Sequence, residues 1–136
     1  MAEHRAVAGD TAAGPGRVLV ALYAVFALAA GSRAAIQLAT RFDEAPLAYL
    51  LSALAAVIYL AATVGLARGS RRVAWTSCAI ELAGVLAVGT AGLLDPGAFP
   101  DATVWSGYGR GYGFVPLVLP VLGLLWLRRT AAVRVG

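Results

Sequence analysis

Residues 46–67 read PLAYLLSALAAVIYLAATVGLA, an apolar run without a single acidic or basic residue. About 20 residues at a helical rise of about 1.5 Å cover the hydrocarbon core of a bilayer, which is roughly 30 Å thick. This stretch therefore predicts a helix that spans a membrane.

Three further apolar blocks flank this run. One precedes it at residues 18–40, and two follow it at residues 73–94 and 112–127. Blocks 18–40 and 73–94 have nearly full spanning length, whereas block 112–127 is short at about 24 Å. We expect that last helix to stand upright, to thin the bilayer locally, or to recruit the Gly/Tyr segment before it.

The composition is that of a membrane protein. Of 136 residues, 60% are hydrophobic and 13% are charged, and the mean hydropathy is +0.79. Soluble domains average about 45 to 50% apolar and about 25% charged residues, and a disulfide scaffold needs more than the single Cys78. The sequence therefore predicts an all-α, polytopic membrane protein, an antiparallel bundle of four transmembrane helices over residues 18–127.

Arginine placement predicts the orientation, because short cytoplasmic loops retain positive charge. All eleven basic residues are arginines, and only Arg41 and Arg110 fall between blocks on one side of the membrane. Eight fall on the other side: Arg5, Arg17, Arg68, Arg71, Arg72, Arg128, Arg129 and Arg134. We therefore expect a cytoplasmic N-terminal tail over residues 1–17 and a cytoplasmic C-terminal tail over residues 128–136.

The membrane is expected to be the plasma (inner) membrane of a bacterium. The chain lacks lysine and asparagine and is dominated by Ala, Gly, Val and Leu, as is typical of GC-rich bacterial genomes. Its arginines lie between apolar blocks rather than on one exposed face, so the lipid bilayer is an expected partner and nucleic acid is not.

Aromatic residues mark both expected membrane boundaries, because Trp and Tyr favour the headgroup level. Trp75 and Trp126 fall at the inner boundary. Trp105, Tyr108 and Tyr112 fall at the outer one, and all five are expected to anchor the bundle at the interfaces.

An alternative interpretation changes the number of helices. The apolar stretch at residues 18–29 ends in Ala27-Leu28-Ala29, which is typical of a signal peptide with a small-residue cleavage site. Against cleavage after Ala29, the apolar character continues beyond it, and the preceding region carries Glu3 and Asp10. Helix 46–67 would enter from outside in either case.

No cofactor, metal site or catalytic constellation is expected. The single histidine, His4, lies in the N-terminal tail, and Met1 is the only methionine, so haem ligands are lacking. Cys78 is expected to pack as a small apolar residue. No spacing of Cys, His and carboxylates fits zinc, and the sequence gives no indication of an enzyme.

Two ionisable residues, Arg33 and Glu81, fall inside apolar blocks. A charge in the bilayer costs at least about 2.5 to 3.5 kcal/mol, so such residues usually face a partner or a water-filled cavity. Their α-carbon levels differ by about 10 Å, so a direct salt bridge needs helix tilt or a shift of one turn. Alternatively, Arg33 reaches the outer interface or pairs with Asp95 or Asp43.

Glu81 shares its depth with two phenols. Counting along the helices places Tyr59 about 10 Å and Tyr23 about 8 Å from the inner face, close to the level of Glu81. One hypothesis is a carboxyl that is hydrogen-bonded to the phenols and holds the helices together. The other is a carboxylate that binds a proton or cation in a carrier.

The outer segment, residues 95–113, alternates glycine with large side chains near its end. Because glycine's backbone freedom is costly to fix, this segment is expected to be an interfacial loop rather than a regular helix. In the helix that follows, Pro116 fits the first turn, whereas Pro120 removes a backbone hydrogen bond and is expected to kink the helix.

Small residues recur at four-residue spacing, for example at Ala27 and Gly31 or at Ala61 and Gly65. Such faces let helix backbones approach closely, which predicts a compact bundle with little room for a substrate. A transporter built from this chain is therefore expected to be a dimer or a larger homo-oligomer.

The outer Trp/Gly/Tyr loop runs into residues 114–120, FVPLVLP, and the last helix ends in Trp126-Leu127-Arg128-Arg129. In this layout the chain resembles small four-helix integral membrane proteins of GC-rich bacteria that have no assigned activity. It is also similar to the small multidrug resistance family, which has four helices and one essential membrane carboxylate. That carboxylate lies in the first helix of the family, whereas here the acid is Glu81 in the third.

These features predict an accessory or scaffold subunit of a larger membrane assembly, with other membrane subunits or further copies of the chain as partners. The alternative is a homo-oligomeric carrier or channel for a small solute or ion, with Glu81 as its membrane carboxylate.

Overall fold

A computed structural model of the protein describes residues 11–135, with side chains up to residue 131. Within this range the chain is helical and contains no strand. Most of the predicted tail 1–17, including Arg5, lies outside the described residues, and so does the side chain of Arg134.

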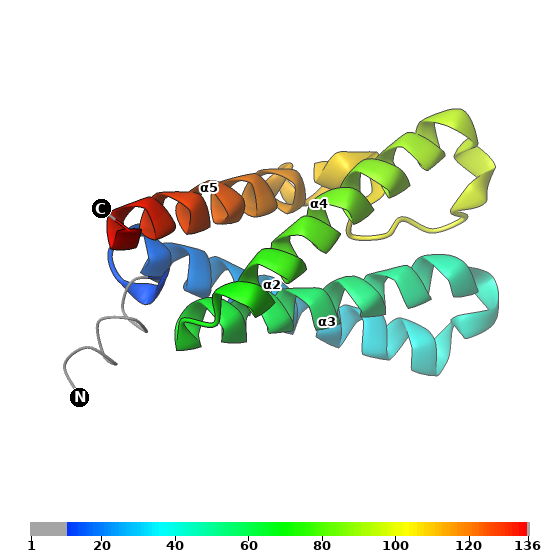
Figure 1. Ribbon diagram of the computed structural model, residues 1–136. Helices are drawn as coiled ribbons and strands as arrows, with labels where there is room; N and C mark the ends of the chain where they lie inside the picture. Colours follow the sequence, from blue (N-terminus) through cyan, green and yellow to red (C-terminus); the bar gives the residue numbers. More distant parts are fainter. Residues whose placement is uncertain (1–10, 136) are drawn as a thin grey trace.

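Four long helices dominate the described part of the chain, and consecutive ones run in opposite directions (Figure 1). The first starts and the last finishes at the same end of the bundle, where the third also begins. The four are α2 (Pro15–Thr40), α3 (Pro46–Arg68), α4 (Arg71–Leu94) and α5 (Val115–Val135). Three short 3-10 helices connect them: η1 (Phe42–Glu44), η2 (Pro96–Ala98) and η3 (Ser106–Tyr112).

By length and hydropathy, α2, α3 and α4 can each cross a membrane. A fourth span is possible only if η3 and α5 are taken together, and these two are bent by 99° at the break between them. The described chain is therefore an all-helical protein with three apolar helices of spanning length.

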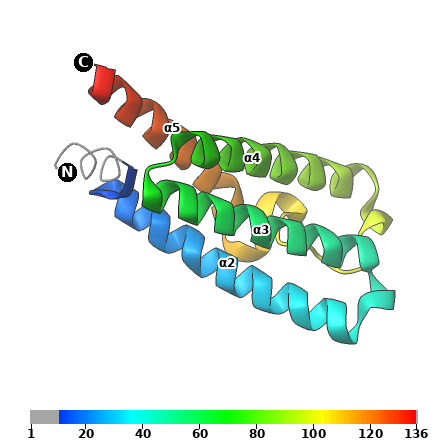
Figure 2. The same ribbon diagram turned by 60° about the horizontal axis from the view of Figure 1, so that its bottom comes forward.

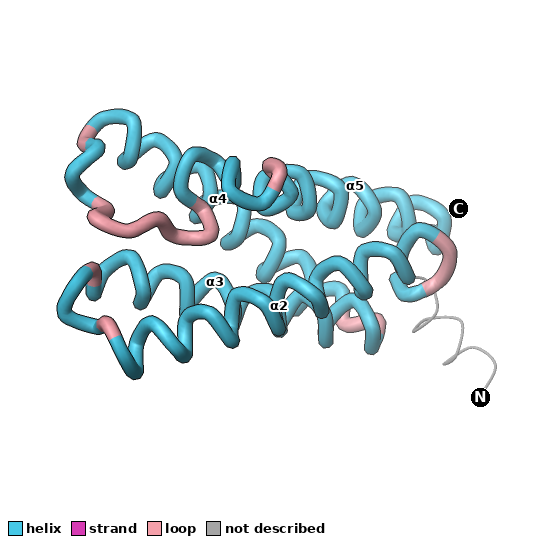
Figure 3. The backbone as a smooth tube through the Cα atoms, turned by 180° about the vertical axis from the view of Figure 1, so that it is seen from behind, coloured by secondary structure: helices cyan, strands magenta, loops and turns pink. Residues whose placement is uncertain are grey.

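The helices form two layers. Figure 2 shows α2, α3 and α4 side by side, with η3 and α5 behind them. The same pairing of α2 with α3 is visible from the other side in Figure 3. Helix α4 is central, because it packs against α3, α5, η2 and η3.

The turn between α3 and α4 is tighter than expected. Gly69 caps α3 in the left-handed conformation (φ 72°), and the backbone N–H of Ser70 donates to the carbonyl of Gly65 at 2.9 Å. Arg71 and Arg72 were expected in this turn, but they form the start of α4.

Helix α5 spans Val115–Val135 instead of residues 112–127. It starts later because Gly113 and Phe114 both have positive φ, which no α-helix allows. It ends later because Arg128 and Arg129 are good helix formers, although they end the apolar run. The whole helix is about 31 Å long and continues through Pro120. Its apolar part is still short, since α5 qualifies as a span only together with η3, the Gly/Tyr segment before it.

The outer connection does not stay at the surface. Residues 103–113, here called the fold-back segment, return between the helices and pack on α4 and α5. The N–H of Val104 donates to Oγ of Ser52 at 3.4 Å, about 9 Å along α3 from its start. Non-helical backbone at such a depth is tolerated where protein covers it. The expectation of an interfacial loop is therefore wrong for this segment, because it packs on α4 and α5.

Candidate functional site

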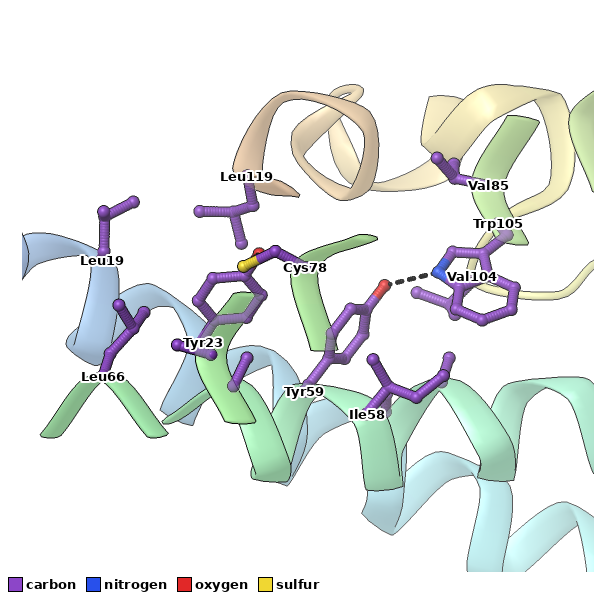
Figure 4. Packing of buried hydrophobic residues seen from close by; sticks show 14 of the residues in the cluster. Leu19, Tyr23, Ile58, Tyr59, Leu66, Cys78, Val85, Val104, Trp105 and Leu119 are labelled. Carbon is purple, nitrogen blue, oxygen red and sulfur yellow. Dashed lines mark hydrogen bonds between the residues drawn. The ribbon is translucent and has the colours of Figure 1, made fainter. Parts of the chain in front are cut away.

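Five side chains meet at the centre of the protein and are here called the buried polar core: Tyr23, Tyr59, Cys78, Glu81 and Trp105. The hydroxyl of Tyr23 donates to Oε1 of Glu81 at 2.7 Å and lies 3.5 Å from Sγ of Cys78. Because its proton points to Glu81, the thiol acts as donor in the second contact. The indole N–H of Trp105 donates to the hydroxyl oxygen of Tyr59 at 2.9 Å, the bond drawn in Figure 4.

The helices bring these residues together through their regular rise. Tyr23 lies on α2, Tyr59 on α3 and Glu81 on α4, and the centroids of the two phenol rings are 6.1 Å apart. Helix α5 closes the core with Gly123, where a Cβ atom would lie 2.7 Å from Sγ of Cys78. A side chain at that position would push α5 away.

Glu81 is enclosed. Its side chain is 0% exposed, and its second oxygen, Oε2, has no hydrogen-bond partner among the described residues. A buried carboxyl oxygen without a partner is costly, so this atom is the one unsatisfied point of the core. The arrangement can hold a proton on Glu81, but in this conformation a water-sized molecule does not reach it.

Trp105 does not lie at the outer interface, where it was expected. It is 2% exposed and penetrates to the level of Tyr59. Gly84 on α4 makes room for it, since a Cβ atom there would lie 2.6 Å from the indole ring. A buried Trp needs an acceptor for its N–H, and the Tyr59 hydroxyl at the expected depth is a signal that sequence reasoning passed over.

Arg33 and Glu81 are not brought together. Nη1 of Arg33 donates to the hydroxyl of Tyr112 at 2.7 Å, which ties the fold-back segment to α2. The Tyr112 ring also packs against Phe26, with centroids 5.9 Å apart. The Tyr112 hydroxyl, rather than Glu81, Asp43 or Asp95, is therefore the hydrogen-bond partner of Arg33.

The other aromatic anchors differ in exposure. Trp75 is 46% exposed on α4, whereas Trp126 is half-buried and donates to the carbonyl of Thr11 at 3.0 Å. Tyr108 and Tyr112 are half-buried, and Tyr108 shares a hydrogen bond of 3.0 Å with Thr90.

Pro116 and Pro120 are both buried on α5. Pro116 packs directly on Gly109, where a Cβ atom would lie 2.8 Å from its ring. This proline therefore locks the end of the fold-back segment onto α5.

Gln37 is a buried polar residue that sequence reasoning overlooked. It is 2% exposed, and both polar atoms of its amide lack a partner in the described part of the chain. The signal was its position, because Gln37 follows Tyr23, Ala30 and Ala34 on one face of α2 at helical spacing.

No protein-family profile matches the chain, and no curated protein or solved structure matches it. The functional argument therefore depends on the geometry. Within the described residues, no group of three or more His, Cys, Asp or Glu side chains converges on a metal-sized site. What the structure offers is a filled polar core and grooves on its outer surface.

Proposed function

We propose that the chain is an integral protein of a bacterial plasma membrane that spans the bilayer four times, with both termini in the cytoplasm, and serves as an accessory or scaffold subunit of a membrane assembly. Orientation is supported by the described arginines, because six of them gather at the end where α2 starts and α5 finishes. They are Arg17, Arg68, Arg71, Arg72, Arg128 and Arg129.

A groove between α2 and α3 carries the subunit proposal. It has a volume of about 440 Å³ and lies halfway along both helices. Its lining is apolar, and half of it is small: Ala24, Ala27 and Gly31 on one side and Ala56 on the other, with Leu28, Val57, Leu60 and Thr63 completing it. Small residues let a further helix backbone approach closely, which replaces the hydrophobic drive that is missing in lipid.

The occupant we propose is a transmembrane helix of another subunit. Helix α2 is the least covered of the three apolar helices, with 22% of its most apolar window buried against 39% for α3 and 33% for α4. The hydroxyl of Thr63, at the end of the groove, donates a hydrogen bond to the carbonyl of Tyr59 at 2.7 Å. The groove therefore presents no free hydroxyl there. A long apolar partner at mid-membrane depth fits these properties.

The test compares two substitutions at one position. A Cβ atom at Gly31 would lie 3.8 Å from Cβ of Ala56, an ordinary contact, so Gly31→Ala leaves the groove open, whereas Gly31→Leu fills it. Native mass spectrometry after gentle extraction is expected to find a fixed-stoichiometry complex with another membrane protein for wild type and Gly31→Ala. Gly31→Leu is expected to lose most of that partner. A bare monomer in wild type, or an unchanged complex with Gly31→Leu, overturns the proposal.

One observation favours a second candidate, a homo-oligomeric carrier for a small solute or ion. It is the unpartnered Oε2 of Glu81, which a proton or cation would satisfy if the bundle opened. In reconstituted vesicles this candidate predicts that Glu81→Gln abolishes proton-coupled or cation flux while helicity and oligomeric state are retained. Flux that is absent in wild type, or unchanged in Glu81→Gln, rules it out.

A further inference from the structure

A second groove lies at the arginine-rich end of the bundle, where α4 begins beside the last turns of α5. We call it the arginine groove. It has a volume of about 380 Å³. Its walls are Arg71, Arg72, Trp75 and Thr76 of α4 and Leu127 and Arg128 of α5.

One wall of the groove is rigid. Nη1 of Arg71 donates to Oγ1 of Thr130 at 2.7 Å, and Nη2 donates to the carbonyl of Leu127. These bonds fasten the start of α4 to α5. The exposed side chains of Arg72 and Arg128 stand on the two helices that are joined in this way, so the fold fixes the backbone positions from which both arginines reach the groove.

The positive potential of the groove exceeds what its arginines alone supply. Arg71 and Arg72 are the first residues of α4, and the N-cap Ser70 makes no side-chain capping bond within the described residues. The free N–H groups and dipole of a helix N-terminus attract anions and disfavour cations. Two arginines at this position therefore raise a potential that a bound anion would relieve.

The acidic residues of the described chain do not neutralise this end. Among residues 11–131, Asp43, Glu44, Asp95 and Asp101 lie at the opposite end, and Glu81 is in the buried polar core. Membrane orientation by itself accounts for positive charge here. It does not account for a groove in which arginines of two helices meet beside a tryptophan.

We propose that the arginine groove binds the phosphate of an anionic phospholipid headgroup. Guanidinium groups match phosphate oxygens with paired, charge-assisted hydrogen bonds, and basic pockets between helices at the cytoplasmic face suit such headgroups. A lipid rather than free phosphate is favoured because Trp75, which is 46% exposed, lines the groove together with the arginines. An indole at the membrane boundary contacts the glycerol and upper acyl region. This inference rests on the proposed membrane placement and is independent of the scaffold role.

The experiment is native mass spectrometry of the full-length protein in detergent, titrated with phosphatidylglycerol or phosphatidylcholine of identical acyl chains. Wild type is expected to bind phosphatidylglycerol at least about 100-fold more tightly, because only this headgroup is anionic overall. Arg72→Gln/Arg128→Gln is expected to lose about 100-fold in phosphatidylglycerol affinity, equivalent to about 2.8 kcal/mol, with phosphatidylcholine binding unchanged.

The matched control is Arg68→Gln/Arg129→Gln, which removes the same charge from the same end but outside the groove. It is expected to change affinity by less than about tenfold, as for screened surface charges. Arg72→Lys/Arg128→Lys keeps the charge without the guanidinium fork and is expected to give an intermediate value. Circular dichroism verifies that each variant is folded.

Three outcomes overturn the inference: equal affinity of wild type for the two lipids, an equal loss in both glutamine double variants, or displacement of phosphatidylglycerol by inorganic phosphate at the same concentration. Incorporation into lipid nanodiscs separates the two proposals. A protein that inserts but shows no lipid preference disproves the headgroup site, whereas one that fails to insert disproves the membrane placement.

Discussion

Trp105 and Tyr59 are two of the largest side chains that the protein buries, and a single hydrogen bond of 2.9 Å joins them. The bond satisfies an indole N–H that bulk solvent does not reach, since Trp105 is 2% exposed. At the residue scale, therefore, the stability of the core depends on a donor that comes from outside the long helices.

Trp105→Phe is expected to lower the free energy of unfolding by about 1 to 3 kcal/mol. The substitution removes the donor to Tyr59 and leaves a small void, while an aromatic ring is retained. Denaturant titration in detergent micelles, followed by circular dichroism, measures the change. Trp75→Phe is the control, because that ring is 46% exposed, and an equal loss there would contradict the buried position of Trp105.

Substitutions at two glycines of α4 are expected to change stability in opposite directions. A Cβ atom at Gly89 would lie 2.3 Å from the Tyr108 ring, whereas one at Gly92 would meet nothing within 4 Å. Gly89→Ala is therefore expected to cost about 1 to 3 kcal/mol through overpacking, and Gly92→Ala to gain up to about 1 kcal/mol of helix stability. The same titration compares them, and similar values for the two variants would refute the packing of Tyr108.

The depth of some core residues can be predicted from the sequence, and that of others cannot. Helical rise places Tyr23, Tyr59 and Glu81 in one layer, and the structure brings them together, because depth along a helix is fixed by residue number. No such rule sets the depth of Trp105, which lies in a non-helical connection. Trp105 is buried because Gly84 on α4 leaves room for its ring. This contact joins two segments that are distant in the sequence, so local sequence patterns do not predict it.

At the scale of elements, the fold-back segment is held in an unusual backbone conformation. Gly107, Tyr108 and Gly109 all have positive φ, with Tyr108 at 60°. A non-glycine residue in this region is disfavoured by about 1 to 2 kcal/mol. The Tyr108 ring against Gly89 and its bond to Thr90 offset that penalty. The alternating glycines predict an irregular segment, but they do not predict which way it turns.

Substitution at two glycines of this segment tests its packing against α5. Both Gly109 (φ 85°) and Gly113 (φ 64°) have left-handed backbones, but only Gly109 touches Pro116. Gly113→Ala is expected to cost about 1 kcal/mol for conformation alone, and Gly109→Ala about 1 to 3 kcal/mol more because of the clash. Unfolding free energies together with proteolysis of the fold-back segment give the comparison. Equal effects would show that Pro116 does not hold the segment.

At the scale of the whole molecule, charge is divided between two ends. The described arginines concentrate where α3 meets α4, whereas Asp43, Glu44, Asp95 and Asp101 lie at the far end. The apolar blocks predict four spanning helices, and three of them, α2, α3 and α4, have the length and hydropathy of a span. The fourth is harder, because η3 and α5 are bent by 99° and their contribution depends on tertiary contacts.

Single cysteines are expected to report the orientation. Cys78 is 0% exposed, so the wild-type chain should resist maleimide until it is unfolded. Gly97→Cys at the outer end is expected to react with a membrane-impermeant maleimide on intact cells, and Ser70→Cys only after permeabilisation. Reaction of Ser70→Cys on intact cells would reverse the proposed topology.

The place of Trp105 in the chain has a consequence for biosynthesis. Helices α2, α3 and α4 are complete once residue 94 has been translated, but the hydroxyl of Tyr59 then still lacks its donor. A chain that ends before residue 103 therefore lacks the indole that Tyr59 accepts from, so the last third of the sequence completes a core whose other members come from the first two thirds.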